Sequence, residues 1–93
     1  MYPKILEKVR ECTRAGRLRF TLHALEEMDA DDLLETDIEN CILNGEIVTR
    51  QWDEEWAEYK YLIAGEALGN EVIEIVARFG HNETTVVVTA YRL

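Results

Sequence analysis

The chain has 93 residues, 47% of them hydrophobic, with one Pro, five Gly and a formal net charge of -9. This length supports one hydrophobic core, so we expect a single domain over residues 1–93, and the composition excludes the disordered and fibrous classes. The negative charge also excludes nonspecific binding of nucleic acid over the whole surface, because like charges repel at long range.

The sequence contains no apolar run close to the roughly 18 to 20 residues that a membrane-spanning helix needs. Its first residues, MYPKILEKVREC, lack the apolar segment and the small-residue cleavage site of a signal peptide. We therefore expect a cytoplasmic protein with no membrane partner.

Charge is distributed unevenly along the chain. Residues 1–20 are net positive, whereas residues 21–76 hold sixteen of the nineteen acidic residues and only two basic ones. Residues 77–93 are slightly positive again. A local basic site is therefore expected only where the two ends of the chain meet.

The first predicted element is an amphipathic helix from Pro3 to about Ala15. Ile5, Val9 and Cys12 recur at helical spacing on one face. Pro3 suits the first turn of a helix, and a glycine at position 16 suits its end.

Two shorter helices are expected next. Thr21 is the predicted N-cap of the first, whose apolar side includes Leu25 and Met28 and which ends in the acidic run at 29–32. The second covers ETDIENCILNG, where Thr36 and Glu39 have the spacing of a capping box and the final glycine closes the turn.

After residue 45 the periodicity changes from helical to two, which predicts four strands near 46–52, 58–65, 71–80 and 84–92. The links between them are too short for a crossover helix, so we expect an antiparallel meander. The predicted fold class is α+β, with two to three N-terminal helices on one face of this four-stranded sheet. In the third strand, Ile73, Ile75 and Ala77 should face the helices, while Arg78 lies on the opposite, open face.

The sequence indicates no metal site or cofactor. Cys12 and Cys41 fall on the apolar stripes of helices, so we expect reduced, buried thiols. No Cys or His lies at metal-ligand spacing from another, and no glycine-rich phosphate loop is present. Trp52 and Trp56 could stack on bases, but the acidic residues around them favour packing under the hairpin or at a protein interface.

His23 is the residue most open to a chemical role. On a helical wheel it points away from Leu25 and Met28, together with Glu26 and Glu27, so it is not expected in the core. One interpretation is an ordinary solvent-facing histidine. The other is a general acid or base, since the imidazole titrates close to neutral pH.

Three segments carry a resemblance: RLRFTLHALEEM, then DIENCILNGEIV, then VVVTAYR. Together they resemble a family of small prokaryotic domains of unknown function that open with Phe-Thr-x-His-Ala and close with Thr-x-Tyr-Arg. That family is similar to RelE and BrnT type toxins, in which helices pack on an antiparallel sheet. Some of those toxins cleave RNA and are held inactive by an antitoxin partner.

The resemblance implies site residues at both ends of the chain. Its two signatures correspond here to Thr21 and His23, and to Thr89, Tyr91 and Arg92. The charge argument alone adds Arg17, Arg19 and Arg78. His23, Tyr91 and Arg78 would be the catalytic groups of a metal-independent endoribonuclease, as base or acid, proton donor or phosphate ligand, and charge clamp. Arg17, Arg19, Thr21, Thr89 and Arg92 would bind substrate.

One residue of this chain departs from the family pattern, and the difference favours functions other than RNA cleavage. Where the family often carries a histidine in the third strand, this chain has Glu74, which would repel a phosphate. A second hypothesis is therefore a catalytically silent relative that binds a protein, or forms a homodimer, through its sheet face or edge strand. A third is a small-ligand domain with a pocket between the helices and the chain ends.

Overall fold

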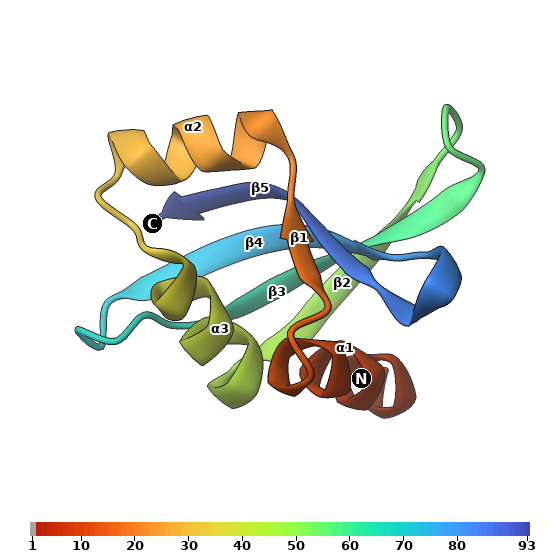
Figure 1. Cartoon of the computed structure of the whole chain (residues 1–93), viewed down its shortest axis with the longest axis horizontal. Helices are drawn as coiled ribbons and strands as arrows, with labels where there is room; N and C mark the ends of the chain where they lie inside the picture. Colours follow the sequence, from red (N-terminus) through yellow and green to blue (C-terminus); the bar gives the residue numbers. More distant parts are fainter. Residues whose placement is uncertain (1) are drawn as a thin grey trace.

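The computed structural model describes residues 2–93, apart from the side chain of His81. Three helices precede most of the sheet: α1 (Pro3–Arg14), α2 (Leu22–Ala30) and α3 (Glu35–Asn44). The strands are β1 (Leu18–Phe20), β2 (Glu46–Asp53), β3 (Glu58–Glu66), β4 (Val72–Phe79) and β5 (Thr85–Arg92), with a short 3₁₀ turn at His81–Glu83. They form one sheet in the order β1-β5-β4-β3-β2 (Figure 1). The α+β prediction is confirmed.

The sheet has five strands rather than four. β2 to β5 form the expected antiparallel meander, but β1 adds a parallel edge strand to β5, with Leu18 opposite Thr85 and Phe20 opposite Val87. A strand of three residues is too short for alternation to identify it, and its partner lies at the far end of the chain. The first and last strands of the protein are therefore neighbours (Figure 1).

The ends of α1 and α2 agree with the sequence pattern. Pro3 occupies the first turn of α1, and Gly16 follows the helix with a φ of 75°, a conformation that favours glycine. The side chain of Thr21 accepts a hydrogen bond from the backbone N–H of Ala24 at 3.1 Å and thereby caps α2. These signals are local, which is why they could be recognised without the fold.

The capping box predicted at Thr36 and Glu39 is wrong. α3 begins at Glu35, and its N-cap position is Leu34, whose backbone N–H donates to the Asp37 carboxylate at 2.9 Å. The other oxygen of that carboxylate accepts the backbone N–H of Leu68 at 3.0 Å. The third residue of the helix, Asp37, thus fixes both the start of α3 and the β3–β4 turn.

Two glycines allow α3 and β2 to approach β3 closely. A Cβ at Gly65 would lie 2.5 Å from the carbonyl oxygen of Cys41 and 2.9 Å from the Cα of Gly45. A Cβ at Gly45 would collide with the carbonyl oxygen of Ala64. Gly45 has a negative φ, so it is required for space rather than for an unusual backbone conformation.

The hydrophobic core lies between the three helices and one face of the sheet. The predicted inward residues of β4 are buried, and they meet apolar side chains from each helix, among them Val9, Met28 and Ile38. The opposite face carries polar side chains such as Glu74 and Arg78, and none of the described helices packs against it. That face and the N-terminal end of α2 position the candidate site.

Candidate functional site

The N-terminal end of α2 and the open face of the sheet enclose a pocket of about 520 Å³. It contains four of the residues predicted from the sequence, drawn from both ends of the chain. The lining residues are Thr21, His23, Asp53, Glu55, Trp56, Lys60, Arg78, Val88 and Thr89. We call it the α2–hairpin pocket, because Asp53, Glu55, Trp56 and Lys60 come from the β2–β3 hairpin.

His23 lies on the first turn of α2, where the Thr21 cap fixes the start of the helix. Its side chain is 67% exposed, and its Nε2 lies 3.4 Å from a carboxylate oxygen of Glu27, one turn further along. The same oxygen accepts the backbone N–H of Ala90 in β5 at 3.2 Å. Glu27 therefore contacts both His23 and β5. The Nδ1 of the imidazole takes no part in this contact.

Arg78 reaches the pocket from the open face of β4. Its Nη1 lies 3.2 Å from a carboxylate oxygen of Glu58, and its guanidinium packs 4.5 Å from the centre of the Trp56 ring. Its side chain is only 14% exposed. The Nε–H of Arg78 is buried and has no hydrogen-bond acceptor among the described residues.

Lys60 is the cationic pocket residue that sequence reasoning missed. Its ammonium lies 3.3 Å from a carboxylate oxygen of Asp53. Partial burial opposes ionisation of Asp53, but the backbone N–H of Trp56 and the Lys60 ammonium hold the pKa of this carboxyl below its usual range. Alternation along β3 could have identified Lys60, because Tyr61 and Ile63 face the core and so place their even-numbered neighbours on the open face.

Tyr91, predicted as a catalytic group, does not line the α2–hairpin pocket. It lines a neighbouring depression on the open face that shares Lys60 with it. Its hydroxyl donates to the Glu74 carboxylate at 2.7 Å, and this hydrogen bond raises the pKa of Tyr91.

The remaining predicted arginines make contacts that hold the fold. The Nε of Arg92 donates to the carbonyl oxygen of Asp31 at the end of α2, and its Nη1 pairs with Glu71 at 2.7 Å. Arg17 donates to the carbonyl oxygen of Glu83 at 3.0 Å. Arg19 donates to the backbone carbonyls beside β1. None of the three lines the pocket.

Comparison of the sequence with models of protein families finds a match over most of the chain. The model described as domain of unknown function (DUF4258) matches residues 20–92, which include every residue of the α2–hairpin pocket. The chain belongs to the DUF4258 family. No curated protein and no solved structure matches it. The family description assigns no activity, so the function of this DUF4258 domain has to be argued from its surface.

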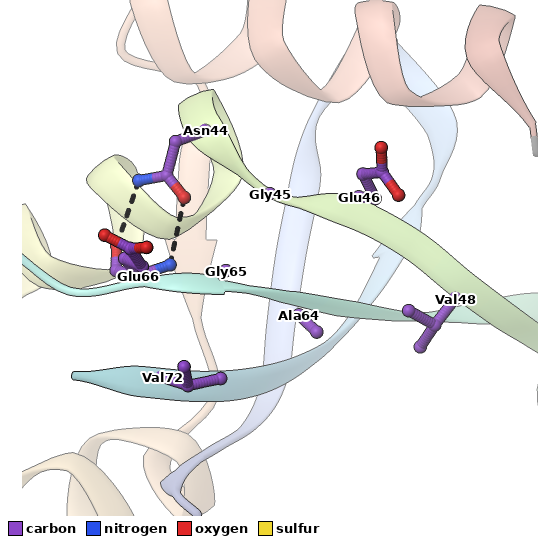
Figure 2. Close-up of a pocket in the computed structure, with 8 residues that line it drawn as sticks. All are labelled: Asn44, Gly45, Glu46, Val48, Ala64, Gly65, Glu66 and Val72. Atoms are coloured by element: carbon purple, nitrogen blue, oxygen red, sulfur yellow. Dashed lines mark hydrogen bonds between the residues drawn. The ribbon is translucent and has the colours of Figure 1, made fainter. Parts of the chain in front are cut away.

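A further pocket of the DUF4258 domain lies where α3 passes into β2 (Figure 2). Asn44 spans it: its side-chain oxygen accepts the backbone N–H of Glu66 at 2.9 Å, and its amide nitrogen donates to the carbonyl oxygen of the same residue at 3.1 Å. The charged side chains that line it are carboxylates, those of Glu46 and Glu66. These contacts join α3 to β3 and bring no acid–base pair together.

The described residues of the DUF4258 domain contain no group of three or more His, Cys, Asp or Glu side chains placed to hold a metal ion. Cys12 and Cys41 are both free and buried, and burial raises the pKa of the Cys41 thiol to about 12, which keeps it protonated. None of the described helices is long and apolar enough to cross a membrane.

Proposed function

We propose that this DUF4258 domain is a ribonuclease with a RelE- or BrnT-like toxin fold, and that it cleaves single-stranded RNA in the α2–hairpin pocket. The observation that carries the proposal is the convergence of His23, Lys60 and Arg78 around one open pocket. These side chains come from α2, β3 and β4. Together they supply the base, the proton donor and the charge clamp that transesterification of RNA requires.

In the proposed reaction, the 2′-oxygen of a ribose forms a bond to phosphorus while the bond from phosphorus to the 5′-oxygen of the next nucleotide breaks. His23 takes the proton of the 2′-hydroxyl, and Lys60 gives a proton to the leaving 5′-oxygen. The products are a cyclic 2′,3′-phosphate and a 5′-hydroxyl. The reaction is balanced without a metal ion, a redox partner or a cofactor.

Arg78 and Trp56 would hold the substrate. Arg78 lines the pocket, and its guanidinium can form charge-assisted hydrogen bonds to a phosphate. The Trp56 ring contacts the Arg78 guanidinium. It is still 60% exposed, so it can also stack on a base beside the bound phosphate. Tyr91 has no part in this proposal, because its hydroxyl is engaged by Glu74.

The carboxylates around the pocket bear on substrate affinity. His23, Lys60 and Arg78 each face a carboxylate within 3.4 Å. An entering phosphate would have to compete with these carboxylates, so the free domain should bind RNA weakly and in a salt-dependent manner. Some of the RelE and BrnT type toxins that the sequence resembles are held inactive by an antitoxin. We therefore propose that a small antitoxin protein is the partner that holds this domain inactive.

The test uses the purified domain and a fluorescent single-stranded RNA. We expect cleavage that leaves a cyclic phosphate, and we expect His23→Gln to lower its rate by about 10²- to 10⁴-fold, the usual contribution of a general base. His81→Gln, at the other histidine of the chain, is the matched control and should retain the wild-type rate. An otherwise identical DNA strand, which lacks the attacking 2′-hydroxyl, should stay intact.

Three results would overturn the proposal: RNA left whole at high protein concentration, equal rates for wild type and His23→Gln, or cleavage of the DNA strand. Expression in bacteria gives an independent readout. Growth arrest with loss of RNA integrity is expected for the wild type, and normal growth is expected for His23→Gln.

A second candidate function, protein binding without catalysis, is favoured by the edge strand β2. β2 has eight residues, contains no proline, and pairs with β3 along one side only. A long unpaired edge is a template for another strand, from a partner or from a second copy of the chain. This function predicts harmless expression, no effect of His23→Gln, and loss of partner binding when Gln51→Pro disrupts the edge.

A further inference from the structure

The region from α2 to the start of β2 combines exposed leucines with a strong excess of negative charge. Residues 20–49 contain nine acidic residues and no Lys or Arg. Within this region, Leu22 is 72% exposed, Leu25 is 40% exposed and Leu34 is 66% exposed. Exposed apolar side chains that lie together inside a polar rim mark interaction sites more often than single ones do.

Leu25 and Leu34 border a groove where α2 meets the start of α3, two helices that are joined by a short link (Figure 1). The groove has a volume of about 220 Å³ and is lined by Leu25, Met28, Asp29, Leu33, Leu34 and Glu35. Met28 and Leu33 are buried, so they form its floor. Leu22 precedes Leu25 by three residues and therefore extends the apolar surface by one helical turn.

The rim of the groove is acidic. Asp29 stands on the α2 side and Glu35 on the α3 side, and neither carboxylate forms an ion pair with a residue that the structure describes. Other acidic side chains of the region do have internal roles, as Glu27, Asp31 and Asp37 accept backbone N–H groups. The rim carboxylates are thus left to a partner of opposite charge.

From these observations we propose that the groove binds a cationic amphipathic helix of another protein. One apolar side chain of that helix enters between Leu25 and Leu34, and its Lys or Arg side chains meet Asp29 and Glu35. Neither α2 nor α3 offers a strand edge, so the occupant binds through its side chains, as in helix-in-groove recognition. The proposal is independent of the proposed RNA cleavage, because the groove and the α2–hairpin pocket share no residue.

Charge and size select this occupant over the others. A second copy of the chain would bring another net charge of -9 and an equally acidic groove, and like charges would oppose the contact. A free small molecule fits less well, because ligand pockets usually have volumes of about 300–1,000 Å³. An anionic membrane or nucleic acid would be repelled.

The probe for the test is a synthetic Leu/Lys peptide of about 18 residues, long enough to form a helix alone, with its leucines in one stripe. A scrambled peptide of the same composition has no stripe. We expect the first peptide to bind the ¹⁵N-labelled domain and to shift the amide signals of α2 and the start of α3. We expect the scrambled peptide to bind at least about tenfold more weakly, a difference of about 1.4 kcal/mol.

Two pairs of substitutions test the groove itself. Leu25→Asp combined with Leu34→Asp should weaken peptide binding at least about tenfold. Leu68→Asp is the matched control: this leucine is 59% exposed, lies in the β3–β4 turn, and should be replaceable without loss of binding. Asp29→Asn combined with Glu35→Gln leaves the apolar groove intact and should reduce both the affinity and its salt dependence. Thermal unfolding of each variant identifies any loss of fold.

The proposal is overturned if both peptides bind equally, if the shifted signals spread over the whole acidic surface, or if Leu68→Asp weakens binding as much as the groove substitutions. It is also overturned if sedimentation finds a dimer of the free domain that the Leu25→Asp and Leu34→Asp pair dissociates, because the occupant would then be a second copy. Loss of RNA cleavage activity would leave all of these outcomes unchanged.

Discussion

Replacing Thr21 with alanine should destabilise the domain by a predictable amount. The Thr21 hydroxyl oxygen accepts the backbone N–H of Ala24 at 3.1 Å and donates to the carbonyl oxygen of Val88 at 3.3 Å. Loss of a threonine N-cap costs about 1 kcal/mol, and loss of the second, longer hydrogen bond costs at least about 0.5 kcal/mol. The expected total is about 1.5–2 kcal/mol.

For a domain of this size, each kcal/mol shifts the melting temperature by about 4–8 °C, so Thr21→Ala should lower Tm by about 6–16 °C. Thermal and urea unfolding followed by circular dichroism measure this change. Thr21→Ser keeps the hydroxyl and should lose less than half as much stability.

The decisive control is Thr36→Ala. Sequence spacing alone predicted Thr36 as the cap of α3, whereas in the structure it is an exposed residue of the first turn. Its removal should change the free energy of unfolding by less than about 0.5 kcal/mol. Equal losses for Thr21→Ala and Thr36→Ala, or a loss below about 0.5 kcal/mol for Thr21→Ala, would refute the assignment of the caps.

Two further predictions concern packing and pH. Gly65→Ala should destabilise the domain by about 1–3 kcal/mol in urea unfolding, because the new Cβ meets the backbone of Cys41 and Gly45. Gly80→Ala, with no atom within 4 Å of its Cβ, should be neutral or slightly stabilising; equal effects would contradict the close approach. Glu74 raises the pKa of Tyr91 above its ordinary value of 10.0, so the stability that this pair contributes is present below pH 10 and is lost as the pH rises through the folded-state pKa. Tyr91→Phe should therefore be less stable than the wild type by about 1 kcal/mol at pH 8. This advantage of the wild type should disappear once Tyr91 is ionised, because the phenolate can no longer donate to Glu74; a wild-type advantage that persists at high pH would rule out the assigned hydrogen bond.

Most of the elements could be read from local patterns. Helical periodicity placed α1, α2 and α3, and alternation placed β2 to β5 and assigned the two faces of β4. These patterns are local because the core side of a helix or strand is fixed by the spacing of its own side chains. The start of α3 was misplaced for a related reason: Thr36 and Asp37 are both acceptable capping residues at nearby positions, and the chain uses Asp37 because it also reaches the backbone N–H of Leu68.

The residues of the candidate site are brought together by contacts between distant parts of the chain, and no local sequence pattern predicts such contacts. The signatures at the two ends of the chain directed attention to Thr21, His23 and Thr89, and charge pointed to Arg78. Lys60 was overlooked because it lies in the acidic middle of the sequence; alternation along β3 places it on the open face, but only strand pairing brings it into one pocket with Arg78. Tyr91 and Arg92, in contrast, belong to the closing signature but are engaged by Glu74 and by the end of α2.

The sequence by itself therefore determined the segments that form α1 to α3 and β2 to β5, which of their faces are apolar, and that its middle is strongly acidic. Only the tertiary structure decided that β1 pairs with β5, so that the start of α2 lies beside the final strand. It also decided which carboxylate faces which arginine, as Glu58 faces Arg78 and Glu71 faces Arg92. The physical reason is that periodicity is set by neighbours along the chain, whereas strand pairing and ion pairs join residues that the chain itself keeps far apart.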